Sequence, residues 1–341
     1  ESSLAFGKYQ FAYIRGRGYR DALAFNVFTW IWAFGNRKRI GLYCSDVAGA
    51  FDCVDAQRLV LKLQAKGVHQ RILKVIESWL GERTAYVCVD GVKSLPFVLS
   101  NMVFQGTVLG PPCWNIFFSD VWEPVRAHDL QEEVYADDLN GFKNYDRELS
   151  NVDIVADLAK CADSVHDWGK VNQVMFDPGK EGFRVLHRRD PMGELFKILG
   201  VDYDCKLLMK ECCLSVYKKC NFKLRCLLRF RKFFADHLTV QLYKSHIMSG
   251  VEAVTAAVYH AANEHLNLFD SMQNRLLTHM GISDTFAFVN YNLAPLVTRR
   301  DIAMLGVIHK SVLGLTHKSL CKLFPPPPPA HRFPTRFSSN V

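Results

Sequence analysis

Residues 133–143, EVYADDLNGFK, consist of two short arms on either side of the tetrapeptide Ala136-Asp137-Asp138-Leu139. This pattern predicts a strand, a tight turn and a second strand. Neighbouring carboxylates repel each other, and one of them tends to keep its proton unless a cation neutralises the pair. The hairpin therefore suggests a cation site, although an Asp-Asp pair is also an ordinary feature of exposed turns.

A third acidic residue, Asp46, ends the apolar segment RIGLYCSD at residues 39–46. This segment predicts a buried strand, and a charge at its end is costly to bury unless it is paired or binds a metal. Asp46, Asp137 and Asp138 together would suit a divalent cation that prefers oxygen ligands, such as Mg²⁺. From the residues alone, a purely structural role stays open.

The remainder of the first 200 residues alternates predicted helices and strands. Asp55 is expected to cap a helix that Gly67 stops, and Asp90-Gly91 is a hairpin signal. The other predicted elements are helices at 70–80, 114–126 and 152–171 and strands at 85–89, 95–99, 183–186 and 196–201. From about residue 206 onward the pattern is helical, and Pro325–Pro329 predict an extended tail.

The composition is that of a globular protein, with 49% hydrophobic and 22% charged residues among 341. The net charge of +8 suits a polyanionic partner but fits an ordinary basic protein equally well. Residues 94–119 are uncharged, yet prolines and amides interrupt them, so we expect no membrane span. Nothing at the start indicates a secretory signal.

Eleven cysteines are present without a CxxC pair or a zinc-ligand spacing. We expect reduced thiols of an intracellular protein, most of them small core residues. A zinc site among the cysteines of residues 205–226 is the lesser alternative.

Several motifs, taken in order, resemble those of reverse transcriptases of non-LTR retrotransposons. Residues 44–54, CSDVAGAFDCV, resemble the first catalytic motif of that family, 104–111, FQGTVLGP, its glutamine-glycine motif, and 135–138, YADD, its aspartate-pair hairpin. Upstream, residues 10–13 and 21–22 resemble the finger motif of the family. Downstream, further matches follow in order at Lys180, 196–201 (the primer-grip motif), and 243–245 and 273–275 (the thumb helices). Ala12, Ile14, Phe104 and residues 112–114 depart from the common pattern.

The resemblance implies an α+β fold: a right-hand polymerase whose palm is an antiparallel sheet backed by helices. Residues 1–38 would be partial fingers, 39–204 the palm, 205–320 a helical thumb and 321–341 a proline-rich tail. The implied activity is RNA-directed DNA polymerisation on an RNA template with a DNA primer and dNTPs. A ribonucleoprotein of nucleus and cytoplasm is expected, and the oligomeric state stays open.

The resemblance also implies roles for single residues. Asp46 and Asp137 would bind two Mg²⁺ ions, with Mn²⁺ as a possible substitute, the Val47 carbonyl would assist, and Asp138 would be a secondary ligand. Phe51 would be a steric gate against ribonucleotides, and Gln105 and Gly106 would line the nucleotide pocket. Lys180 would donate a proton to pyrophosphate or neutralise phosphate charge. Without the family, Phe51 is a core residue and Lys180 a surface one.

A basic region follows the predicted palm, with nine basic residues and one acidic residue between Lys206 and Lys232. Val216, Cys220, Leu224 and Leu227 follow helical spacing, which predicts an amphipathic helix. Beside a polymerase palm its charged face is expected to contact phosphates without base readout. The candidates for nucleic-acid binding are Lys219, Lys223, Arg225, Arg229 and Lys232, with Lys197 from the primer-grip motif.

Two other functions remain open from the sequence. An intron-type maturase would use the same palm and thumb chiefly to bind a structured RNA, and an RNA-splicing domain after the thumb would favour it. A catalytically inactive remnant would bind nucleic acid only. The family's earlier finger motifs, expected before residue 1, are not part of this sequence, and no endonuclease domain is visible in it.

Overall fold

A four-stranded antiparallel sheet forms the centre of the molecule. The structure, a computed structural model, describes Gly7 and residues 9–81, 83–99 and 101–324. The strand order is β6-β7-β1-β8, made of β1 (Arg39–Asp46), β6 (Gln131–Tyr135), β7 (Asp138–Tyr145) and β8 (Gly182–Leu186). The predicted hairpin is confirmed, because β6 and β7 pair with Tyr135 opposite Asp138.

Both faces of this sheet are covered, which explains the uninterrupted apolar sequence of β1. Every residue of β1 is buried. Ile40, Leu42 and Cys44 belong to a core that continues into the C-terminal helices, whereas Tyr43 belongs to a second core that includes residues of α6 (Asn151–Asn172). Gly41 lets α6 approach the strand, since a Cβ there would lie 2.8 Å from Cγ2 of Ile154.

Helix α1 (Tyr19–Gly35) packs between the sheet and the C-terminal helices. Its first turn is capped by Asp21, whose carboxylate accepts a hydrogen bond of 3.0 Å from the Gly18 N–H. Ala22, Leu23 and Trp30 are fully buried in the core shared with β1. The segment predicted as partial fingers therefore packs on the predicted palm, and its assignment as a separate part stays a prediction.

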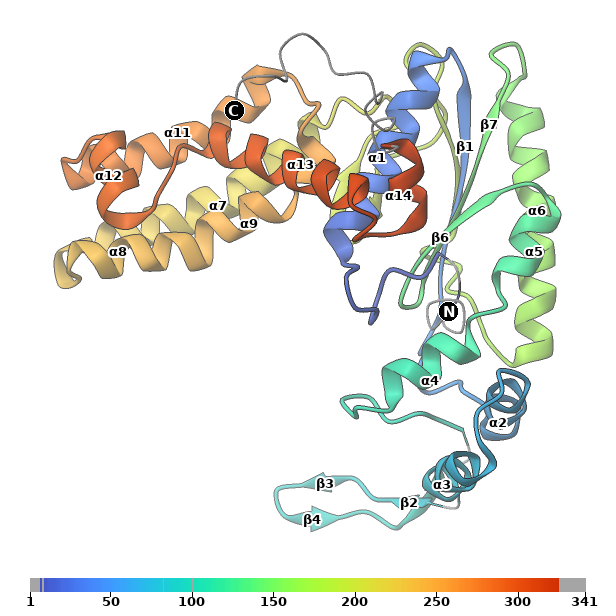
Figure 1. The fold of residues 1–341 in the computed structure, drawn as a ribbon. Helices are drawn as coiled ribbons and strands as arrows, with labels where there is room; N and C mark the ends of the chain where they lie inside the picture. The colour runs from blue at the N-terminus through green and yellow to red at the C-terminus, as the bar shows by residue number, and fades with distance from the viewer. Residues whose placement is uncertain (1–6, 8, 82, 100, 325–341) are drawn as a thin grey trace, which may run out of the picture.

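An extended arm follows β1. The predicted helices are confirmed as α2 (Ala56–Ala65), which the Asp55 carboxylate caps, and α3 (Gln70–Leu80). The hairpin at Asp90-Gly91 is also confirmed, with φ of 51° and 82°. Each of its arms is broken into two short strands, however: β2 (Arg83–Ala85), β3 (Cys88–Val89), β4 (Val92–Lys93) and β5 (Phe97–Leu99). Figure 1 shows this arm below the sheet, projecting to the same side as the C-terminal helices.

Two other predicted elements were wrong in their bounds. The single helix expected at 114–126 is a pair, α4 (Gly110–Phe117) and α5 (Trp122–Ala127), and Pro111 and Pro112 lie in the first turn of α4, where a missing N–H costs little. The single strand expected at 196–201 is a hairpin of β9 (Phe196–Ile198) and β10 (Val201–Tyr203). Its turn residues Leu199 and Gly200 both have positive φ.

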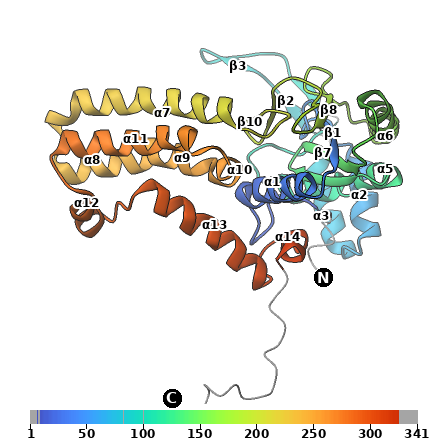
Figure 2. The same ribbon diagram turned by 90° about the horizontal axis from the view of Figure 1, so that it is seen from above.

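The C-terminal part is helical, as predicted. Its α-helices are α7 (Lys210–Phe230), α8 (Asp236–Tyr243), α9 (Ser249–Ala253), α10 (Thr255–Val258), α11 (Asn263–Met280), α12 (Asp284–Tyr291), α13 (Leu296–Val312) and α14 (Lys318–Leu323). A 3₁₀ helix, η2 (Arg231–Phe233), extends α7 at its C-terminus, and a π-helix, η3 (Lys244–Met248), joins α8 to α9. Helix α7 packs against α8, α9 and α11 (Figure 2), and α14 returns to α1. This arrangement of a sheet backed by helices with a helical extension is the α+β fold expected from the sequence. The polyproline segment 325–329 lies outside the described residues.

The cysteines are free thiols, and most are core residues, as predicted. The buried ones are Cys44, Cys113, Cys161, Cys205, Cys212, Cys213 and Cys220. Burial raises the pKa of the Cys212 thiol to about 12 and that of Cys213 to about 11, as expected for thiols in the core. Within the described chain, no helix combines the length and the apolar character that a bilayer crossing needs.

Candidate active site

Strand pairing brings the predicted acidic residues together at one end of the sheet. Asp46 is the last residue of β1 and lies opposite Asp138, the first residue of β7. Asp137 occupies the turn before Asp138. Asp46 is only 7% exposed, and Asp137 and Asp138 are half-buried. The hairpin thus concentrates three carboxylates where water screens their charges poorly.

The turn itself is held by two side chains that the sequence did not single out. Ala136 has a φ of 58°, which is unusual for a residue with a Cβ. Gln10 Oε1 accepts a hydrogen bond of 3.0 Å from the Ala136 N–H, and Trp114 Nε1 donates one of 2.9 Å to the Ala136 carbonyl. In the sequence, Gln10 belongs to the motif at 10–13, and Trp114 belongs to residues 112–114, which depart from the family pattern; neither position predicts a contact with Ala136. No local pattern marks such long-range partners.

The electrostatics of the carboxylates reflect their crowding. Burial, followed by a hydrogen bond and repulsion from Asp46, raises the pKa of Asp138 to about 7. The pKa of Asp137 is also raised, chiefly by burial and less by Asp46, while Lys180 acts to lower it. The site therefore holds excess negative charge that a cation would relieve.

Lys180 supplies one such cation. Its Nζ lies 2.5 Å from Oδ2 of Asp46, and this hydrogen bond raises the pKa of the lysine. The loop that carries it is fixed to the same strand end, because the Asp177 N–H donates to the Asp46 carbonyl at 2.8 Å. The Lys180 side chain is nevertheless 62% exposed, so its ammonium can reach solvent or an incoming phosphate.

A cavity of about 440 Å³ lies between the aspartates and the β9–β10 hairpin. Asp46 and Asp138 line it on one side, and Lys180, Arg184 and Lys197 contribute positive charge. Lys197 is also 3.4 Å from Asp202. Among the described residues, Asp137 and three predicted nucleotide-binding residues (Phe51, Gln105 and Gly106) are not part of this lining.

The predicted nucleotide-binding residues lie outside the lining of this cavity. Phe51 is half-buried, and its ring centre is 6.2 Å from that of Trp114. Gln105 is exposed, and Gly106 has a φ of 81°, a conformation that favours glycine. Val47, the residue that follows Asp46, is buried and forms an antiparallel backbone bridge with Phe176.

Carboxylate oxygens suit a hard divalent cation. Asp46 and Asp138 offer such oxygens from paired positions on β1 and β7. In the part of the chain that the structure describes, no three His, Cys, Asp or Glu side chains converge as a ready metal cage. Asp137 would have to turn toward Asp46 to complete one, and Lys180 would have to yield its place on Asp46.

The predicted phosphate-binding residues of α7 and its C-terminal extension lie outside this cavity. Lys219, Lys223, Arg225, Arg229 and Lys232 are all exposed. Lys223 donates to the His246 carbonyl at 3.3 Å, and the other four have no carboxylate within 4 Å among the described residues. Phe222 and Phe230 are exposed on the same helix, so basic and aromatic side chains alternate along it.

Known proteins match this chain over most of its length. A family model described as reverse transcriptase (RNA-dependent DNA polymerase) matches residues 5–203. The RNA-directed DNA polymerase from the mobile element jockey is 27% identical over 302 residues in Drosophila melanogaster and 23% identical over 303 residues in Drosophila funebris. These alignments cover 80% and 81% of this chain but 32% of each relative, so the chain spans about a third of their length.

Solved structures with some likeness to this chain include telomerases. Apo telomerase from Candida tropicalis, truncated from its C-terminal domain, gives a TM-score of 0.41 at 16% identity over 53% of this chain and 38% of that chain. Telomerase from Candida albicans, in complex with a TWJ fragment of telomeric RNA, gives 0.41 at 10% identity over 79% and 51%.

The crowding of the carboxylates predicts a pH-dependent cost to stability. The pKa of Asp138 is higher in the folded chain than the ordinary value near 4, so its contribution to stability is lost as the pH rises through about 7. In EDTA at pH 8, Asp138→Asn should stabilise the chain by about 1–2 kcal/mol, and at pH 4 the gain should vanish. Urea unfolding at both pH values measures this.

The matched control is Asp163→Asn, which removes an exposed carboxylate of α6 and should change stability little at either pH. Equal or lower stability of Asp138→Asn at pH 8, relative to the wild type, would contradict the repulsion inferred at this site.

Proposed function

Because this chain belongs to the reverse transcriptase family, we propose that it catalyses RNA-directed DNA synthesis. It would transfer a nucleotide from a dNTP to the 3′-hydroxyl of a primer paired with an RNA template. One observation carries the proposal: strand pairing places Asp46 against Asp138 beside a cavity that Lys180 and Lys197 also line. Such transfer needs charge and positioning more than covalent chemistry from the protein.

The same proposal assigns the acidic residues to divalent metal. Asp46, Asp137, Asp138 and the Val47 carbonyl would hold two Mg²⁺ ions, which Mn²⁺ could replace. When bound, these ions would lower the pKa of the primer hydroxyl and stabilise the departing pyrophosphate. Burial, and then Asp46, raise the pKa of Asp138, and a bound cation would favour its ionised form.

Lys180 would act on the leaving group. Its ammonium keeps its proton while it is paired with Asp46. A metal ion on Asp46 would free the lysine, and its exposed side chain could then turn to the pyrophosphate, neutralise it and donate a proton. Lys197, on the other wall of the cavity, would contact the primer backbone.

The exposed basic face of α7 would bind the backbone of the primer–template duplex. Lys219, Arg225 and Arg229 offer charges without carboxylate partners among the described residues. Contacts of this kind add affinity that falls with salt and carry no sequence preference. A maturase-like or inactive RNA-binding protein would use the same face but would have no need of the carboxylate pair.

The direct test is primer extension on an RNA template with Mg²⁺ and dNTPs. It should be run with the 341-residue chain. Asp137→Ala should lower the rate by about 10³-fold or more, because it removes charge stabilisation of the transition state. The exposed Asp163→Ala is the matched control and should extend like the wild type. Extension that is absent from the wild-type chain, or insensitive to Asp137, refutes the proposal.

The gate assignment has its own test. Phe51→Val should raise ribonucleotide incorporation relative to deoxynucleotide incorporation on the order of tenfold, because the smaller side chain leaves room for a 2′-hydroxyl. The ratio of kcat/KM for the two substrates measures it. A ratio that stays at the wild-type value would return Phe51 to the core, with its Trp114 contact as its role.

The Ala136 clamp, made by the hydrogen bonds of Gln10 and Trp114 to the Ala136 backbone, predicts that these side chains position the neighbouring aspartates for catalysis. Trp114→Phe keeps an aromatic side chain in the core but removes the indole N–H that donates to the Ala136 carbonyl. A looser aspartate turn should lower kcat about tenfold, which corresponds to about 1.4 kcal/mol, with the KM for dNTP nearly unchanged. Phe117→Leu, a core change on the same helix, should lower thermal stability without this selective loss of kcat. If Trp114→Phe instead raised KM alone, the clamp would not be what orients the site.

A further inference from the structure

A second, strongly basic pocket lies at the opposite end of the central sheet. Strand β1 begins beside it at Arg39 and ends at Asp46, and eight strand residues span about 25 Å. The pocket has a volume of about 360 Å³. It is lined by Phe34 and six basic side chains, Arg37, Lys38, Arg147, His187, Arg188 and Arg189. Phe34 comes from the last turn of α1, and the six basic residues come from the turn before β1 and from the stretches after β7 and β8.

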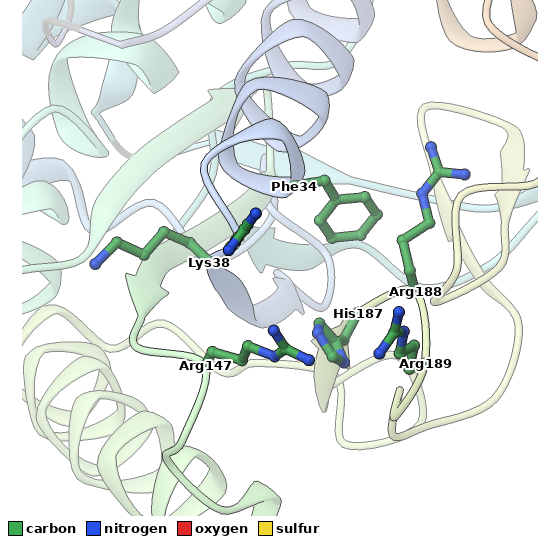
Figure 3. A pocket seen from close by; sticks show the side chains of 7 residues that line it. Phe34, Lys38, Arg147, His187, Arg188 and Arg189 are labelled. Carbon is green, nitrogen blue, oxygen red and sulfur yellow. The ribbon is translucent and has the colours of Figure 1, made fainter.

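The positive charge of this pocket is largely uncompensated. Lys38 pairs with Asp146 at 2.5 Å, and Figure 3 shows its ammonium directed away from the other side chains. Asp190 is engaged with Arg39 at 2.8 Å. Across the described residues, no carboxylate lies within 4 Å of the guanidinium groups of the four arginines that line the pocket.

Three of the side chains converge. Figure 3 shows the guanidinium groups of Arg147 and Arg189 on either side of the His187 ring. The Asp190 N–H donates to Nδ1 of His187 at 3.1 Å, so the neutral imidazole carries its proton on Nε2 and presents a donor there. Burial lowers the pKa of His187, and Arg39, Arg147 and Arg189 lower it further. An anion between these donors would satisfy all three.

A buried arginine holds this arrangement in place. The Arg39 side chain is 5% exposed and donates to the Leu149 carbonyl, to Asn151 and to Asp190. It therefore ties the segment that carries Arg147 to the segment that carries His187 and Arg189. The backbone N–H of His187 also donates to the Cys205 carbonyl at 3.0 Å. The donors project from fixed backbone, so little order has to be gained on binding.

We propose that this pocket binds the phosphodiester backbone of a single nucleic-acid strand, at a place separate from the catalytic aspartates. Arginine forks suit phosphate oxygens, and exposed guanidinium groups suit a long polyanion. A lipid surface fits less well, because the lining offers no exposed apolar side chain, and Phe34 is half-buried under Arg188. Binding in this pocket would lengthen the stretch of the nucleic-acid strand that contacts the protein, well beyond the active-site cavity.

The experiment measures binding of a fluorescent single-stranded 40-nucleotide RNA by anisotropy, in EDTA and without dNTPs, over a series of salt concentrations. Arg147→Ala/Arg189→Ala should lose about tenfold in affinity at 50 mM salt and reduce the salt slope by about 1–2. Lys66→Ala/Lys160→Ala removes two exposed charges elsewhere and should lose less than twofold. Arg147→Lys/Arg189→Lys should retain part of the affinity. Because no catalysis is involved, the test stands apart from the proposed polymerase activity.

Parallel arms separate the sources of phosphate. DNA of the same length should show the same loss as RNA, since the backbone is read. If the double alanine variant binds RNA and DNA like the wild type, or loses no more than the lysine control, the proposal fails. It also fails if the variant keeps RNA affinity but loses binding of inorganic pyrophosphate or of phosphatidylserine vesicles, since the occupant would then be a small anion or a membrane.

Discussion

The antiparallel pairing of β1 with β7 is the constraint on which the rest of the structure depends. Its register places Asp46 opposite Asp138 at the end of a sheet that is covered on both faces. Buried carboxylates that repel each other are costly, and burial first and Asp46 second raise the pKa of Asp138. This electrostatic cost is tolerated because hydrogen bonds from Gln10 and Trp114 hold the turn at Ala136, and because Lys180 pairs with Asp46.

The sequence predicted elements whose signal is local. The apolar run of β1, the Asp55 cap and the Asp90-Gly91 turn were all read correctly, as was the α+β class. The sequence-based prediction was wrong where contacts between distant parts of the chain decide the bounds of an element. The helix expected at 114–126 breaks after Phe117, and the strand expected at 196–201 folds back at Leu199 and Gly200.

The candidate site shows the same division between local and long-range signals. The three aspartates and Lys180 could be named from motifs, and the structure brings them to one strand end. Their supports could not be named, because the partners of Ala136 lie 126 and 22 residues away in the chain. The basic pocket was missed for a similar reason. Its basic residues lie in two short runs, at 37–38 and 187–189, and at Arg147, which are far apart in the sequence, and only the sheet gathers them at its far end.

The central claim is that Asp46 and the 136–138 turn together hold a divalent cation. Iron-directed cleavage tests it most directly: Fe²⁺ replaces Mg²⁺, ascorbate and peroxide generate hydroxyl radicals at the ion, and the cut sites in the chain are mapped. Cleavage should cluster near residues 46 and 136–138, fall when Mg²⁺ competes, and vanish in Asp46→Asn. Cuts that lie elsewhere, or that persist in Asp46→Asn, would contradict the account.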